Sequence, residues 1–180
     1  MVTKRLSIPS IFFHWLVFLL FLVALASIEY REFVASGDPL RATLRSTHVL
    51  FGQLILIASI VRLYVRIRFA SVPHNSATPA WMSRGAMGVH TLLYGVMLLQ
   101  PLLGILSMQT GGKTVMFFSW TLPQLMEPNT LLHFSIKDAH KTVATAFYVL
   151  IAMHIAGALV HHFVVKDDTL RRMLTLRSKS

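Results

Sequence analysis

The chain has 180 residues, 54% of them hydrophobic and only 13% charged, a balance that excludes an ordinary soluble domain of this length. It contains no cysteine, which excludes a disulfide framework, thiolate-bound metal, iron–sulfur clusters and haem attached through a C-x-x-C-H motif. The formal net charge of +10 comes from Lys and Arg at the ends of apolar segments, without a basic stripe interleaved with aromatic residues. We therefore expect contact with anionic lipid headgroups and no nucleic acid.

Four apolar segments follow one another and predict an all-α fold, a bundle of four transmembrane helices in a single membrane domain, residues 1–180. The expected spans cover about residues 10–30, 47–66, 84–108 and 138–165. The first follows Lys4 and Arg5 as a signal peptide would, but no A-x-A-like cleavage site comes after it, so we expect it to be retained. The second reaches full length only if His48 and Arg62 sit near the two interfaces. Residues 109–137 are expected to form an outer loop that lies as a cap along the membrane surface.

The basic residues are divided unevenly between the two sides of this predicted bundle. With both termini on one side, that side collects eleven Lys and Arg, whereas the other side has six. The six are Arg31, Arg41, Arg45, Lys113, Lys137 and Lys141. Because cytoplasmic segments carry the excess of Lys and Arg, the pattern predicts that both termini are cytoplasmic.

The histidines fall into layers on this topology. An α-helix places His140 and His154 roughly 21 Å apart and within about 40° of the same face. His48, at the start of the second span, is predicted to face His140 in an outer layer, and His14, in the first span, to face His154 in an inner layer. Ionisable side chains are costly inside a membrane, so each pair is a candidate functional site.

Paired imidazoles in a helical bundle are typical of haem iron held from both sides, an arrangement that suits electron transfer. Zinc would require roughly four converging ligands, which neither layer offers. We therefore predict two non-covalently bound haems b, an outer one ligated by His48 and His140 and an inner one ligated by His14 and His154. The alternative is that each histidine packs at an interface or hydrogen-bonds to a neighbouring helix.

Two further histidines lie near the inner layer. We favour a proton-handling or quinone-contacting role for His90 and His161, because quinone reduction consumes protons and histidine titrates near neutral pH. His161 could instead replace His154 as a ligand, with His90 as its partner, and simple interfacial packing is a third reading. The remaining histidines, His74, His133 and His162, are expected at the surface.

Basic residues on the outer side lead to a further prediction. Arg41, Arg45, Lys113, Lys137 and Lys141 could draw a small anion toward the outer haem. Ordinary contact with lipid headgroups is the alternative.

Five stretches, distributed over nearly the whole chain, carry a likeness to known proteins. They are FHWLVFLLF around His14, IEYREF after the first span, THVLFGQLILIASIVRL around His48, MGVHTLLYGVMLLQPLLGIL in the third span, and IKDAHKTVATAFYVLIAMHIAGALVHHFVVKDDTLRRML near the end. Together they resemble the bacterial cytochrome b561 family, and the last stretch is the most specific.

This resemblance implies a four-helix dihaem cytochrome of the bacterial inner (cytoplasmic) membrane, with bis-histidine ligation at His14, His48, His140 and His154. It also implies an oxidoreductase reaction. Superoxide, or another small donor, would be oxidised by one electron at the periplasmic face, and electrons would pass through two haems to ubiquinone.

Two other functions are compatible with parts of the sequence. A haem-bearing anchor subunit would relay electrons for a dehydrogenase or hydrogenase partner and would co-purify with it. A non-redox transporter would use the histidines to move protons or metal ions. The lack of acidic residues between the ends of the spans and of any internal repeat argues against a transporter.

Overall fold

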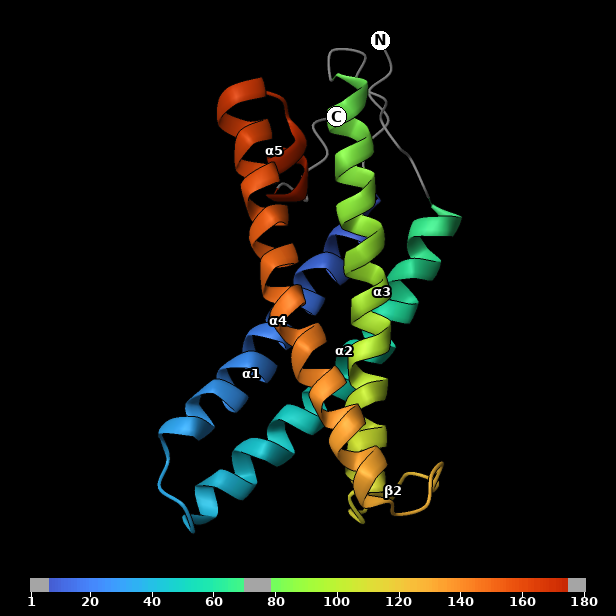
Figure 1. Cartoon of the computed structure of the whole chain (residues 1–180). Helices are drawn as coiled ribbons and strands as arrows, with labels where there is room; N and C mark the ends of the chain where they lie inside the picture. The colour runs from blue at the N-terminus through green and yellow to red at the C-terminus, as the bar shows by residue number, and fades with distance from the viewer. Residues whose placement is uncertain (1–6, 70–78, 175–180) are drawn as a thin grey trace.

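The computed structural model describes residues 7–69 and 79–174, and four long helices form its framework (Figure 1). These are α1 (Ile8–Phe33), α2 (Pro39–Arg68), α3 (Ala80–Thr110) and α4 (Thr130–Val160). α4 continues into a π-helical turn, η1 (His161–Val165), which is followed by the short helix α5 (Thr169–Leu174). Two short antiparallel strands, β1 (Met116–Phe117) and β2 (Trp120–Thr121), form a hairpin in the loop before α4.

Polar residues fix where three of these helices begin. Ser7, Asp38 and Asn129 each accept a hydrogen bond from a backbone N–H of the first turn of α1, α2 and α4, which satisfies a donor that the helix itself leaves unpaired. Two of these helices begin earlier than the apolar spans predicted from the sequence. α2 begins at Pro39 and α4 at Thr130, each about eight residues before the expected apolar span, so the helices extend past the part that hydropathy detects.

The loop before α4 is accordingly shorter than the predicted cap, since residues 130–137 are helical. It folds back onto the bundle. The amide of the buried Gln109 donates to Pro123 O at 2.8 Å and accepts from Leu125 N at 3.0 Å, and Gln53 of α2 donates to Met116 O at 3.1 Å. The end of the bundle that carries β1 and β2 is therefore built partly from this loop.

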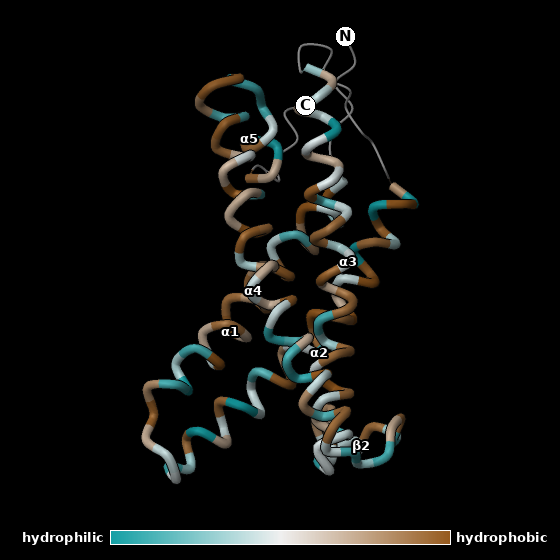
Figure 2. The backbone as a smooth tube through the Cα atoms, viewed as in Figure 1, coloured by the Kyte–Doolittle hydropathy of each residue, from teal (hydrophilic) through white to brown (hydrophobic). Residues whose placement is uncertain are grey.

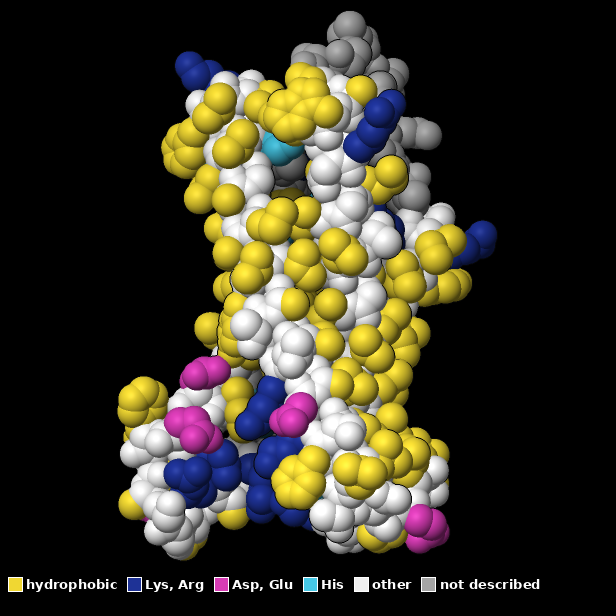
Figure 3. Space-filling model, viewed as in Figure 1, with side chains coloured by type: hydrophobic (Ala, Val, Ile, Leu, Met, Phe, Trp, Pro, Cys, Tyr) yellow, Lys and Arg dark blue, Asp and Glu magenta, His cyan; other side chains and the backbone are white. Residues whose placement is uncertain are grey.

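All four long helices are long and apolar enough to cross a membrane, which confirms the predicted bundle of four spanning helices. Hydrophobic residues, drawn in brown, recur along the whole length of the long helices (Figure 2). Large apolar side chains such as Phe12, Leu22, Leu99 and Val149 remain exposed along them, and apolar side chains cover much of the visible waist of the molecule (Figure 3). Such a surface suits contact with lipid.

The helices pack as two antiparallel pairs that cross each other. α1 lies along α2 and α3 along α4, and the joined tips of α1 and α2 stand away from α3 and α4 (Figure 1). One buried residue from each helix meets at the crossing: Val17, Ala58, Met97 and Phe147. We call the end that carries β1 and β2 the hairpin end, and the opposite end the α5 end. Phe147 lies seven residues from both His140 and His154, so the crossing separates the two histidine layers.

Candidate functional site

Two histidines from different helices face each other toward the hairpin end. His48 of α2 and His140 of α4 have ring centroids 6.3 Å apart and ring planes at 87°. Each Nδ1 lies beside a backbone carbonyl, 2.9 Å from Ala24 O for His48 and 3.1 Å from Gln100 O for His140. Because a carbonyl only accepts, Nδ1 carries the proton, and Nε2 of the neutral ring keeps its lone pair. Both rings are thus prepared to ligate a metal ion through Nε2.

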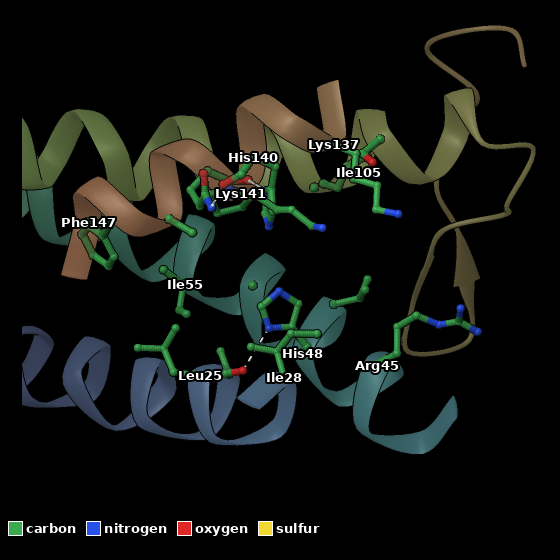
Figure 4. A pocket seen from close by; sticks show the side chains of 18 of the residues that line it. Leu25, Ile28, Arg45, His48, Ile55, Ile105, Lys137, His140, Lys141 and Phe147 are labelled. Carbon is green, nitrogen blue, oxygen red and sulfur yellow. Dashed lines mark hydrogen bonds between the residues drawn. The ribbon is translucent and has the colours of Figure 1, made fainter. Parts of the chain in front are cut away.

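These two rings line a cavity of about 610 Å³ between the two helix pairs (Figure 4). Its volume is in the range of small-molecule and cofactor sites. Apolar side chains line it as well, among them Leu25, Ile28, Ile55, Ile105 and Phe147. Gly52, one turn after His48, also lines the cavity. The space beside its backbone is open, since a Cβ added there would meet nothing within 4 Å. We call this space the hairpin-end cavity.

Cations gather where the hairpin-end cavity opens, between the tip of α1 and α2 and the start of α4 (Figure 3). Those that line it are Arg31, Arg45, Lys113, Lys137 and Lys141. Partial desolvation, followed by repulsion from three neighbouring cations, lowers the pKa of Lys113 below its usual value. The three are Arg45, Lys137 and Arg31. Glu29 and Glu32 line the cavity as well, and Arg31 pairs with Glu32 at 2.7 Å, so five cations face two carboxylates and the mouth keeps an excess of positive charge.

Arg41 departs from the prediction that it would belong to this group. It donates to Val34 O in the turn after α1 and lies 4.0 Å from a carboxylate oxygen of Glu32. Arg31, which the sequence analysis did not place among the anion-guiding residues, does line the cavity, with its Nη1 2.7 Å from Glu32 Oε1.

A second pair of histidines lies toward the α5 end. The rings of His14 on α1 and His154 on α4 have centroids 6.1 Å apart and planes at 57°. The ring of His90 on α3 is 5.2 Å from that of His154. Three imidazoles thus meet here, one from each of three helices, and His90 packs directly on one member of the predicted pair.

Arg62 of α2 makes the α5-end pair chemically different from the other. Its Nη2 donates to His14 Nδ1 at 2.9 Å, so a neutral His14 carries its proton on Nε2. His14 would bind a metal ion as a neutral ligand only after Arg62 gives up this hydrogen bond. Arg62 and Arg66 also stack on the ring of Tyr94, at 5.2 Å and 5.5 Å, and neither pairs with a carboxylate within residues 7–69 and 79–174.

Comparison with known proteins decides the family. The model of prokaryotic cytochrome b561 matches residues 5–176. The chain belongs to the prokaryotic cytochrome b561 family. It is 33% identical to cytochrome b561 homolog 1 of Escherichia coli (strain K12) over 174 residues, covering 97% of this chain and 99% of the relative. It is 31% identical to the probable superoxide oxidase CybB of Yersinia pestis over 172 residues, covering 95% and 96%. It is also 30% identical to cytochrome b562 of Cereibacter sphaeroides over 130 residues, covering 72% and 67%.

A cytochrome b561 carries haem b, so this chain is a multi-pass bacterial membrane protein of haem-based electron transfer. The two histidine pairs fit such a group in their ring spacing, the α5-end pair once Arg62 releases His14 Nδ1. Two imidazole nitrogens, each about 2 Å from one metal ion, would place their ring centres about 6 Å apart. The pairs stand at 6.3 Å and 6.1 Å. A bare metal ion fits less well, because no group of three or more His, Cys, Asp or Glu side chains is placed to hold one in the described part of the chain.

His161 of this cytochrome b561 has a partner that the sequence analysis missed. In η1 its Nδ1 lies 2.7 Å from Asp167 Oδ2, and both side chains are largely buried, with 17% and 9% exposed. Asp167 Oδ1 accepts from Thr169 N at 2.9 Å. Desolvation opposes the carboxylate, but its hydrogen bonds with Thr169 and His161 prevail and lower the pKa of Asp167 below its usual value. The pair holds the imidazole of His161 in a fixed orientation.

The other histidines are placed as follows. His133 was predicted at the surface but is half-buried, with Nδ1 donating to Ser107 O at 2.7 Å and the ring packed on Gly111. His162 is also half-buried rather than exposed. His74 lies outside the described residues. His133 was expected in the outer cap, whereas the helix α4, which begins at Thr130, includes it and turns it toward α3.

Proposed function

We propose that this chain is a dihaem cytochrome b of the bacterial inner membrane that oxidises superoxide at the periplasmic face and reduces ubiquinone. His48 and His140 would hold one haem b, and His14 and His154 the other. Each haem would supply a centre that gains and loses one electron. The observation that carries the proposal is the presence of two histidine pairs, at spacings that fit a shared metal ion, on either side of the apolar crossing.

The reaction would balance with two superoxide anions for each quinone. Each superoxide gives up one electron and leaves as dioxygen, and two electrons with two protons convert ubiquinone to ubiquinol. The 31% identity to a probable superoxide oxidase supports the choice of donor. The cations around the hairpin-end cavity support it as well, because superoxide is a small anion.

The cation cluster would act on the approach of superoxide, before electron transfer. Like charges at the mouth of an apolar cleft raise the local concentration of an anion and can increase its association rate by about 10- to 1,000-fold. Lys113, Lys137 and Arg45 are close enough to one another for repulsion to shift the pKa of Lys113, so their fields add at the mouth. The association rate should therefore fall as the ionic strength rises.

The α5 end would handle the protons of quinone reduction. This assignment places it on the cytoplasmic side, which agrees with the positive-inside rule applied to the whole sequence. His161, oriented by Asp167, would hold a proton at Nε2 for the quinone oxygen. His90, whose ring packs on His154, would line the same region.

An optical spectrum of the detergent-purified protein, dithionite-reduced minus oxidised, tests the proposal together with a pyridine haemochrome count. We expect low-spin b-type bands and about two haems per chain. Rapid mixing with superoxide should then reduce the protein, and a ubiquinone analogue should reoxidise it. One haem per chain would refute the paired assignment, and no reduction by superoxide would refute the donor. Co-purification of a soluble dehydrogenase would favour an anchor subunit instead.

A further inference from the structure

Helix α3 holds His140 at three points. His140 Nδ1 donates to the backbone carbonyl of Gln100 at 3.1 Å, and the side-chain Nε2 of Gln100 donates back to the backbone carbonyl of His140 at 2.7 Å. Gly104, one turn further along α3, lies against the ring itself. Gln100 thus hydrogen-bonds to both the ring and the backbone of His140, and Gly104 contacts the edge of the ring.

Gly104 is the position where this fit is tightest. A Cβ built there would lie 3.3 Å from His140 Cε1 and 3.6 Å from Nδ1, and the first distance is shorter than ordinary carbon–carbon contact. The ring edge that carries the Nδ1 hydrogen bond therefore touches α3 where α3 has no side chain. Any side chain at position 104 would push this edge away from Gln100 O.

The other glycines in the same helix differ. A Cβ at Gly95 or Gly88 would meet nothing within 4 Å, and both residues are exposed. Glycine lowers helix stability by about 1 kcal/mol relative to alanine at each of these positions. Only at Gly104 would the added methyl group of alanine meet His140.

We propose that Gln100 and Gly104 are positioning residues that set the reduction potential of the haem at His140. This inference rests on the proposed ligation by His48 and His140. A hydrogen bond from Nδ1–H to a carbonyl makes the imidazole a stronger electron donor through Nε2. An imidazole that donates more electron density favours ferric iron. The contacts of Gln100 and Gly104 with His140 therefore keep the reduction potential of this haem lower than the same two ligands would give without them.

Gly104→Ala tests the inference, and Gly95→Ala is its matched control. Both changes add one methyl group to the same helix and bring the same gain in helix propensity, but only the first meets His140. Redox titrations of the purified holoprotein, followed in the α band, should resolve two components. The component lost in His48→Leu identifies the haem of this pair.

In Gly104→Ala this component should move to a more positive potential, or its haem should be lost, while the other component stays unchanged. Gly95→Ala should match the wild-type protein in both components. Gln100→Leu, which removes only the amide grip, should shift the same component in the same direction by less. If the Gly104→Ala protein does not accumulate in the membrane, the redox titration of Gln100→Leu tests the inference instead.

Three results would overturn the inference while leaving the dihaem proposal intact. The first is that Gly104→Ala and Gly95→Ala give the same reduction potentials. The second is that only the component retained in His48→Leu shifts. The third is that the component lost in His48→Leu shifts to a more negative potential. Failure of the dihaem proposal would be recognised separately, by the absence of two components in the wild-type protein.

Discussion

The contact between His161 and Asp167 gives a sharp prediction for Asp167→Asn. The Nδ1–Oδ2 distance is 2.7 Å, and the two side chains are only 17% and 9% exposed, so solvent screens the pair little. Hydrogen bonds to charged groups contribute about 1.5–3 kcal/mol. Asparagine can keep an oxygen toward Thr169 N but presents an uncharged NH₂ group to His161, which must move its proton to Nε2 to accept from it, so the bond to a charged group is lost and with it most of that free energy.

This loss corresponds to a fall in the unfolding midpoint of roughly 3–12 °C for a chain of this size, measured by thermal unfolding in detergent at pH 7. The reoxidation of the reduced protein by a ubiquinone analogue should also slow, because His161 loses its orientation. Asp168→Asn is the matched control. Its carboxylate is 62% exposed and lies 3.9 Å from Arg171, and an exposed pair of this kind contributes at most about 1 kcal/mol.

The pH dependence follows from the lowered pKa of Asp167. A carboxyl group with a lower pKa in the folded protein stabilises it above its unfolded pKa of about 4, and this contribution is lost as the pH falls through the folded pKa. The part of the stability difference between wild type and Asp167→Asn that comes from this carboxyl group should therefore be fully present down to about pH 5 and then shrink in stronger acid. An unfolding midpoint and a reoxidation rate equal to those of the wild type at pH 7 would refute the reasoning.

Three other changes test separate parts of the molecule. His48→Ala should lower the haem count from about two to about one per chain in a pyridine haemochrome assay, while His14→Ala should remove the other haem. Lys137→Glu should slow reduction by superoxide several-fold at low salt and flatten its salt dependence, whereas Arg84→Glu near the α5 end should leave the rate unchanged in the same stopped-flow measurement. Phe147→Ala should destabilise the protein by about 3–5 kcal/mol, since this ring is only 4% exposed at the helix crossing, and a thermal melt in detergent would show it.

In an α-helix the sequence separation of two residues fixes both their distance along the axis and the angle between them around it, and this explains what the sequence could predict. The spacing of His140 and His154, with His14 and His48 in neighbouring spans, was enough to predict which rings approach one another, and the structure brings these rings within 6.3 Å and 6.1 Å. Whether they bind haem iron stays a prediction. The four spanning helices were predicted because an apolar stretch of sufficient length has few other stable arrangements.

Contacts that depend on chain reversal or on a single rotamer could not be predicted in this way. Asp167 meets His161 because the helix widens into η1 and Lys166 takes a left-handed conformation, with φ 55°, and neither event leaves a periodic signal. Arg62 was predicted as an interface anchor, which fitted its place at the end of an apolar run. Its hydrogen bond to His14 depends on how α2 packs along α1, a property of packing and not of composition.

The crossing of the two helix pairs has a consequence for biosynthesis. Each histidine pair joins a ring from α1 or α2 with a ring from α4, so the first two helices leave the ribosome with one half of both sites. The missing halves lie fourteen residues apart on α4. At about 5–20 residues per second they emerge within about 1–3 s of each other. Insertion of the last span therefore completes both sites almost together, and a chain truncated before α4 should emerge with neither site complete, rather than with one of the two.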